Sequence, residues 1–187
     1  MSDSPRRASA EFVGDRGIVW NSVEGSELYS DGYFGQPVGI RKPKSPEFDK
    51  PLELSLIECA YLSRLGRLEV HDAKSNSILS FEDLLEIGKQ HSDDFMERLT
   101  VYTNLRELGY ILRPGLKFGT DFAVYEHGPG KDHAPFLVHV IPQRKGVVPL
   151  DIVRAGRLAT SVRKKFIIAT VKEEGEVFYY SFVWHKP

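Results

Sequence analysis

Three side chains in the second half of the chain, Tyr125, His133 and Lys164, have types that could act together on a phosphodiester. The stretch GLKFGTDFAVYEHGPGKDHAPFLVHV places the tyrosine and the histidine on either side of a glycine and proline turn, so both can lie at one end of a strand pair. RNA supplies its own nucleophile, the 2′-hydroxyl. A base for that hydroxyl, an acid for the leaving 5′-oxygen and a cation for the transition-state charge are therefore sufficient. The alternative is that the tyrosine in the strand serves packing alone.

Two of these roles stay open at the level of the sequence. His127 competes with His133 for the role of the acid, whereas His139, inside an apolar strand, is expected to be a hydrogen-bonded structural histidine. A free tyrosine has a pKa near 10 and is a poor base at neutral pH. Tyr125 therefore needs help from Lys164 or from the phosphate site, or else it orients the 2′-hydroxyl without deprotonating it.

A helix is expected from about Asp151 to Lys165. Its periodicity would place Arg157, Ser161 and Lys164 on one face, with Lys165 about 100° further round. Such a cationic stripe can be a phosphate-binding surface or simply a solvated one.

A metal-dependent nuclease is a weaker alternative. Asp121 and Glu126 are five residues apart in what the pattern predicts to be one strand, so their carboxylates would face opposite sides. The single cysteine, Cys59, excludes a disulfide framework and a cysteine-based zinc site. We expect neither a metal nor an organic cofactor.

The elements that must position these residues are strands and helices of a C-terminal domain, residues 93–187. A helix is expected after Ser92, with Gly109 as its C-terminal stop. Four period-two or β-branched runs follow, and they predict strands: FAVYEH, PFLVHVIP, FIIATV and VFYYSFVW. The last run is aromatic on both faces, which favours burial at a subunit contact.

The N-terminal domain is expected over residues 11–92, after a flexible segment of residues 1–10. Short β-like pieces come first, and a proline-rich exposed loop follows at about residues 37–51. Capping boxes at Ser55 with Glu58 and at Ser80 with Asp83 predict the starts of two helices. These two helices and the helix after Ser92 are expected to form the core of this half.

The charge of the chain is nearly balanced overall but is unevenly distributed. The 187 residues carry a net charge of −1, whereas residues 98–165 contain 12 Lys and Arg against 5 Asp and Glu. A local phosphate-binding surface is therefore compatible with the total. No apolar run is long enough for a membrane span, and we expect a cytoplasmic protein.

The combination of KFGTDFAVYEHG, a following histidine, and SVRKK resembles the catalytic domain of the archaeal tRNA-splicing endonuclease family. LELSLIECAYLSRLG resembles the helix of that family's N-terminal domain, so the resemblance covers the chain from about Glu11 onward. It implies a mixed α/β (α+β) fold, with a small N-terminal helix and sheet domain and a C-terminal nuclease-like domain around a central mixed sheet. It also implies that Tyr125 is the general base, His133 the general acid and Lys164 the transition-state cation.

The same resemblance implies residues that bind the substrate, precursor tRNA containing a bulge-helix-bulge motif. Arg157 and Trp184 would clamp a flipped bulge nucleotide, because a guanidinium plane and an indole can sandwich a base by cation–π and stacking contacts. Lys44 lies in the proline-rich loop, which resembles an insertion of crenarchaeal enzymes, and it could contact a phosphate.

The resemblance further implies assembly with a second, structural endonuclease subunit in a two-plus-two heterotetramer. The acidic loop with Glu173, Glu174 and Glu176 would contact the partner subunit. The alternative is that this chain is itself a non-catalytic structural or RNA-binding subunit of the same endonuclease. The presence of Tyr125, His133 and Lys164 favours the catalytic interpretation.

Overall fold

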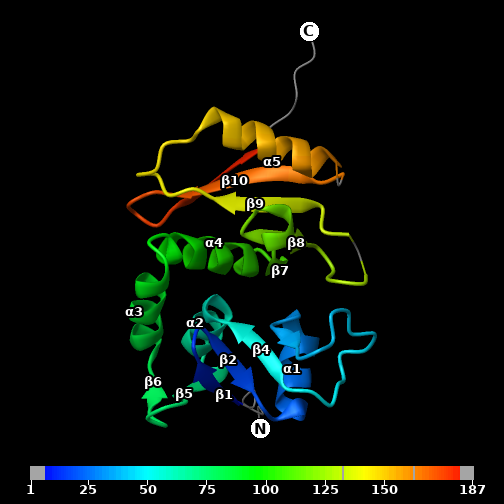
Figure 1. Ribbon diagram of the computed structural model, residues 1–187, viewed down its shortest axis with the longest axis vertical. Coiled ribbons are helices and arrows are strands. Elements are labelled where there is room, and N and C mark those ends of the chain that lie inside the picture. The colour runs from blue at the N-terminus through cyan, green and yellow to red at the C-terminus, as the bar shows by residue number, and fades with distance from the viewer. Residues whose placement is uncertain (1–6, 132, 162, 182–187) are drawn as a thin grey trace. The chain divides into compact units, whose positions relative to one another are not determined.

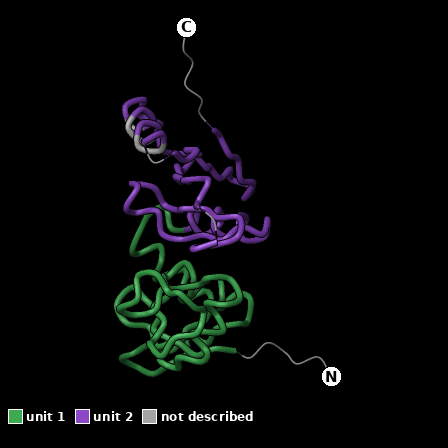
Figure 2. The backbone as a smooth tube through the Cα atoms, turned by 90° about the vertical axis from the view of Figure 1, so that its right-hand side faces the viewer, with its two compact units in different colours: residues 1–95 green, residues 96–187 purple. Residues whose placement is uncertain are grey.

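The computed structural model describes residues 7–131, 133–161 and 163–181. The chain divides into two compact units, residues 1–95 and 96–187 (Figure 2). The boundary expected from the sequence was near Ser92. Each unit combines helices with a sheet that contains parallel and antiparallel pairs, so the predicted mixed α/β fold is confirmed (Figure 1). No helix in the described ranges is long and apolar enough to cross a membrane.

The N-terminal unit is built on a six-stranded sheet in the order β3-β4-β2-β1-β5-β6. Its strands are β1 (Ala8–Val13), β2 (Arg16–Val19), β3 (Gln36–Pro37), β4 (Leu52–Ser55), β5 (Leu68–Asp72) and β6 (Ile78–Leu79). β1 and β5 are parallel, and the other neighbours are antiparallel.

Two expectations for this unit need correction. Residues 8–10 were assigned to a flexible segment, but β1 begins at Ala8, because pairing with β5 buries Ala8 and Ala10. Gln36–Pro37, at the start of the proline-rich segment, forms the short edge strand β3 and pairs with β4. An edge strand tolerates proline because one side of its ladder is open.

Three helices belong to the N-terminal unit: α1 (Ser22–Gly32), α2 (Leu56–Arg64) and α3 (Phe81–His91). The two predicted capping boxes are present, at Ser55 with Glu58 and at Ser80 with Asp83. α1 was not predicted. Its start is fixed by the Asn21 side chain, which accepts hydrogen bonds from the backbone of Val23 and Glu24.

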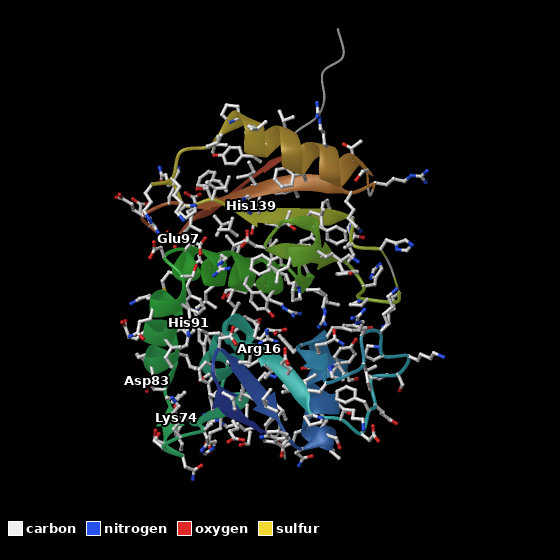
Figure 3. All side chains as sticks on the ribbon, viewed as in Figure 1. Arg16, Lys74, Asp83, His91, Glu97 and His139 are labelled. Atoms are coloured by element: carbon white, nitrogen blue, oxygen red, sulfur yellow. The ribbon has the colours of Figure 1, made fainter. Side chains whose placement is uncertain are left out.

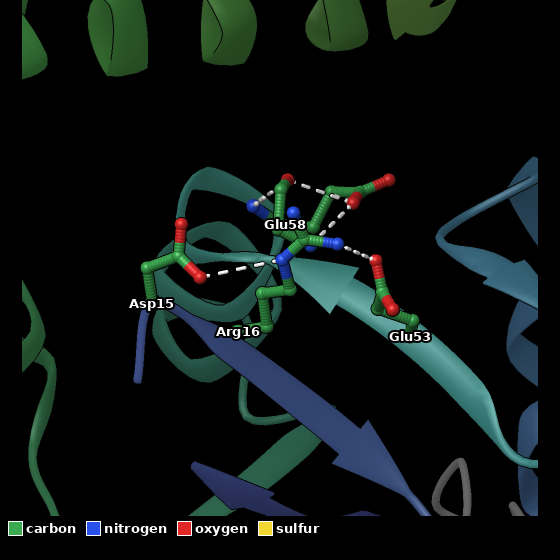
Figure 4. Close-up of polar contacts among 5 residues, drawn as sticks. Asp15, Arg16, Glu53 and Glu58 are labelled. Carbon is green, nitrogen blue, oxygen red and sulfur yellow. Dashed lines mark hydrogen bonds and ion pairs between the residues drawn. The ribbon is translucent and has the colours of Figure 1, made fainter. Parts of the chain in front are cut away.

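Polar contacts connect these elements around Arg16 of β2 (Figure 4). Its guanidinium pairs with Asp15 at 3.3 Å and with Glu53 of β4, and the hydrogen bond to Glu53 is the main cause of a raised pKa of Arg16. Glu58 is buried, and its Oε1 accepts from the Gly35 backbone at 2.8 Å. The carboxylate that caps α2 therefore also fixes the segment before β3.

The C-terminal unit is a five-stranded sheet in the order β11-β10-β9-β8-β7, with the parallel pair β9 and β10 among antiparallel neighbours. Its strands are β7 (Ile111–Pro114), β8 (Phe122–Tyr125), β9 (Phe136–Val140), β10 (Lys165–Val171) and β11 (Val177–Ser181). β7 was not predicted from the sequence, whereas the other four runs are strands.

Two helices cover opposite faces of this sheet, as Figure 1 shows: α4 (Phe95–Glu107) and α5 (Pro149–Ser161). On one face, Tyr102 of α4 packs against Phe122, with ring centroids 5.7 Å apart. On the other face, Ile152 of α5 packs against a group that we call the Ala134 cluster, consisting of Ala123, Ala134, Leu137, Phe166 and Ile168.

The C-terminal end of α4 is as predicted, but the role expected of this helix in the N-terminal core is not. Gly109 has φ +88° and donates to Arg106 O, while Tyr110 N donates to Leu105 O, which is the Schellman pattern. However, all but the first residue of α4 belong to the C-terminal unit, so the prediction that this helix completes the N-terminal core is wrong. The reason is that α4 packs its apolar side against the C-terminal sheet, as the contact of Tyr102 with Phe122 shows.

Candidate functional site

The candidate site lies at one end of the C-terminal sheet, which we call the Tyr125 end. β8 finishes there at Tyr125, which pairs with the first residue of β7. Because β8 and β9 are antiparallel, β9 starts at this end. Because β9 and β10 are parallel, β10 also starts there, with Lys165 opposite Phe136. The sheet topology thus brings the segments before β9 and β10 beside the end of β8.

Tyr125 is half-buried and packs against the Ala134 cluster. Its neighbour in β8, Val124, pairs with Phe136 at the start of β9. The tyrosine is therefore anchored by packing in the last position of its strand, next to the loop that leads into β9.

His133 lies in that loop and is exposed. The loop turns through Gly128 and Gly130, which have φ values of +109° and +89°, a region that favours glycine. Ala134, directly after the histidine, is buried in the core. The histidine is thus attached to a fixed backbone position, while His127, its competitor, is exposed near the start of the same loop.

Lys164 directly precedes β10, and its Nζ donates a hydrogen bond to Ala134 O at 2.5 Å. The same Nζ lies 5.8 Å from the centroid of the Phe118 ring. Since Ala134 follows His133, the lysine ammonium lies against the backbone next to the histidine. The structure therefore brings Tyr125, His133 and Lys164 to the same end of one sheet.

The prediction that Lys164 shares a helix face with Arg157 and Ser161 is wrong. α5 ends at Ser161, and Arg163 has φ +54°, which a continuing helix does not allow. The chain must straighten there because Lys165 begins β10, where its backbone N donates to Pro135 O at 2.9 Å.

Two of the three predicted substrate-binding residues lie among the described residues. Arg157 is exposed, about one turn before the end of α5. Lys44 is exposed in the loop between β3 and β4 of the other unit. Trp184 lies outside the described residues.

The acidic loop lies at the opposite end of the sheet from Tyr125. Glu173, Glu174 and Glu176 are exposed in the turn that joins β10 to β11. Gly175, with φ +83°, donates to Lys172 O at 2.9 Å and closes this turn. β11 is the outermost strand of the sheet, and its Tyr180 is 50% exposed.

A second polar group lies at the far end of β8, where the sequence did not indicate that Asp121 and His139 would pair. Asp121 Oδ2 accepts from Val140 N at 2.8 Å and lies 2.8 Å from Nδ1 of His139. His139 (Figure 3) is therefore the hydrogen-bonded structural histidine that the sequence predicted. Asp121 and Glu126 flank β8 at its two ends, so they do not converge on one site.

The arrangement at the Tyr125 end suits acid–base chemistry on a phosphodiester. It combines a phenol, an imidazole and an ammonium, which can serve as base, acid and charge stabiliser. The sequence predicts these three residues as the catalytic set, but it assigns no role to Phe118 or to the Ala134 carbonyl, both of which contact the Lys164 ammonium. The motif KFGTDFAVYEHG contained Phe118 without indicating where its ring would lie.

Comparison with known proteins gives one consistent result. The chain matches the family model of the tRNA intron endonuclease N-terminal domain over residues 8–85, and that of its catalytic C-terminal domain over residues 95–179. A tRNA-splicing endonuclease of Hyperthermus butylicus is 44% identical over 179 residues, which are 95% of this chain and 98% of the relative. With the same coverage, tRNA-splicing endonucleases of Saccharolobus islandicus (strain Y.N.15.51) and Saccharolobus solfataricus are 40% and 39% identical.

Proposed function

Because the chain belongs to the tRNA intron endonuclease family, we propose that it is a catalytic subunit that cuts precursor tRNA at bulge-helix-bulge motifs. The observation that carries this proposal is the convergence of Tyr125, the backbone next to His133, and the Lys164 ammonium at one end of the C-terminal sheet. A subunit with a purely structural role would have no need of this arrangement.

In the proposed reaction, Tyr125 takes the proton of the 2′-hydroxyl, and the 2′-oxygen forms a bond to the adjacent phosphorus. The bond from phosphorus to the 5′-oxygen breaks, and His133 gives its proton to that oxygen. Lys164 stabilises the additional negative charge on the phosphoryl oxygens. The products are a 2′,3′-cyclic phosphate and a 5′-hydroxyl, and no step requires a metal ion.

Recognition of the substrate would extend beyond the reacting residues. Arg157 and Trp184 would hold an extruded base by stacking and cation–π contacts. Lys44, exposed in the loop after β3, would contact a phosphate. A second, structural subunit would complete a two-plus-two assembly through the acidic loop at Glu173, Glu174 and Glu176.

The decisive experiment measures cleavage of a bulge-helix-bulge RNA in EDTA, by this chain alone and with a candidate structural subunit. Lys164→Ala should lower the single-turnover rate constant by about 10² to 10³-fold, the usual effect of losing a transition-state stabiliser, and leave the RNA Kd within a few-fold. Lys165→Ala is the matched control and should remain active.

Two results would contradict the proposal. One is full cleavage by Lys164→Ala. The other is activity that disappears in EDTA and returns with magnesium. If the wild-type chain binds the RNA but does not cleave it under either condition, it is the structural or RNA-binding subunit instead.

The two histidines of the loop before β9 provide a test of the acid. His133→Ala should reduce the rate constant by about 10² to 10⁴-fold, as expected for loss of a general acid, whereas His127→Ala should cleave normally. An RNA with a 5′-thio leaving group needs no protonation and should restore the rate of His133→Ala. The reverse ranking of the two variants would assign the acid to His127.

A further inference from the structure

The aromatic ring of Phe118 lies between two parts of the candidate site. It packs against the Ala134 cluster, as Tyr125 does. Its centroid is also 5.8 Å from Lys164 Nζ, within the roughly 6 Å over which a ring face attracts an ammonium. One side chain thus touches the core that carries Tyr125 and supports the cation proposed to stabilise the transition state.

The backbone that carries Phe118 is held firmly. The residue ends the short helix η1 (Leu116–Phe118), in the loop between β7 and β8. Gly115 N donates to Asp121 O at 2.9 Å, and Gly119, with φ +63°, donates to Leu116 O at 3.0 Å. A Cβ on Gly115 would meet Thr120 Oγ1 at 2.4 Å, so this loop is closely packed on itself. The ring is therefore presented from a defined position.

Lys164 depends on such support because its side chain is long and flexible. The contacts of its ammonium include the Ala134 carbonyl and the Phe118 ring, which come from segments far away in the sequence. The same ring also attracts Lys117, whose Nζ lies 4.8 Å from the centroid. The Phe118 ring therefore lies within cation–π range of two lysine ammonium groups.

We propose that Phe118 is a positioning residue for Lys164: its ring, together with the Ala134 carbonyl, fixes the ammonium where the cleaved phosphate must lie. This inference rests on the proposed function. Pre-orienting a charged group lowers the cost of reaching the transition state, and a small displacement of that group is expensive in rate. The ring therefore acts on the rate of the chemical step and leaves RNA binding nearly unchanged.

The test compares ring removal with ring retention. Phe118→Leu and Phe118→Met should each lower the single-turnover rate constant about tenfold, because the cation–π contact and its orientation are lost. The RNA Kd should stay within about twofold, and Phe118→Tyr, which keeps the ring, should cleave at nearly the wild-type rate. Phe136→Leu is the matched control, because Lys165 Nζ lies 5.9 Å from the Phe136 ring in a comparable pair. It should retain the wild-type rate.

A double-mutant cycle separates positioning from general packing. If Phe118 acts through the ammonium, Phe118→Leu should cause no further loss in a Lys164→Ala background, measured over long single-turnover time courses. A wild-type rate for both Phe118→Leu and Phe118→Met, or an equal loss with and without Lys164, would overturn the inference. If Lys164→Ala is slow while these variants are normal, only this inference fails. If Lys164→Ala is itself normal, the proposed function fails with it.

Discussion

At the scale of single residues, the same residue types serve different purposes in different surroundings. Lys164 and Lys165 are neighbours, yet the first donates to the Ala134 carbonyl, while the second lies over the Phe136 ring. His133 is exposed in a loop, whereas His139 is engaged with Asp121. Surroundings rather than residue type separate a candidate catalytic group from a structural one.

Cys59, the only cysteine of the chain, illustrates this dependence on surroundings in its titration. It lies on α2 and is completely buried. Burial, aided by the negative charge of Glu58, raises the pKa of its thiol well above the ordinary value of about 9. The folded state therefore keeps the proton at a pH where the unfolded state has lost it.

This difference predicts a loss of stability at high pH. Above about pH 9, the free energy of unfolding should fall by up to about 1.4 kcal/mol per pH unit, because the Cys59 thiol is ionised in the unfolded state and not in the folded state. Cys59→Ala should remove this contribution. The free energy of unfolding of the wild type minus that of the variant should therefore decrease as the pH rises from 8 to 10. Denaturant titrations followed by circular dichroism measure it, and a difference independent of pH would contradict the prediction. Burial also raises the pKa of Tyr179, and that contribution remains in both proteins.

At the scale of elements, the packing of α2 on the N-terminal sheet depends on one glycine. A Cβ on Gly17 of β2 would lie 2.5 Å from Cys59 Sγ, whereas its next neighbours, the Cβ atoms of Ala10 and Leu54, would be at ordinary distances of 3.5 and 3.8 Å. The helix therefore approaches β2 closely only because residue 17 has no side chain.

Gly17→Ala should consequently destabilise the protein by about 1 to 3 kcal/mol, the usual cost of overpacking a core. Because the overlap is with one sulfur, Cys59→Ala should offset part of this loss, giving a favourable coupling in the double mutant. Gly146→Ala is the control, since a Cβ there meets nothing within 4 Å. Strictly additive free energies of unfolding would show that the sulfur is not the cause.

At the scale of the whole molecule, the C-terminal sheet separates two surfaces. The Tyr125 end carries the candidate catalytic residues, and the opposite end carries the exposed turn with Glu173, Glu174 and Glu176. Charged groups exposed in this way contribute little to the stability of their own chain. Their clustering on one turn instead suits attraction to a basic surface on a partner.

If the proposed two-plus-two assembly forms through this turn, changing Glu173, Glu174 and Glu176 to Gln should weaken assembly with the proposed structural subunit by tenfold or more, roughly 1.4 kcal/mol. The melting temperature of the chain alone should not change. Light scattering after size exclusion, at low and high salt, measures the assembly. A variant with Glu47, Glu82 and Glu86 changed to Gln removes as many exposed charges and should assemble normally. Equal behaviour of the two variants would contradict a specific role for the acidic turn.

Features that depend on neighbouring residues could be predicted from the sequence. The capping boxes at Ser55 and Ser80 and the stop at Gly109 each involve hydrogen bonds between residues a few positions apart, so their motifs were sufficient. The alternation of β-branched residues likewise identified four of the five C-terminal strands. α1 was not predicted because glycines interrupt its apolar pattern. Apart from Gly25, its buried residues are Leu28 and Tyr29.

Features that depend on pairing between distant segments could not be predicted from the sequence and are visible only in the folded chain. β1 begins at Ala8 because it pairs with β5, sixty residues later, and α5 ends at Ser161 because Lys165 pairs with β9. The contact of Lys164 with Ala134 and the Phe118 ring follows from the same strand order. Local hydrogen bonds are encoded by adjacent residues, whereas such contacts arise only when the whole sheet has formed and its register is set.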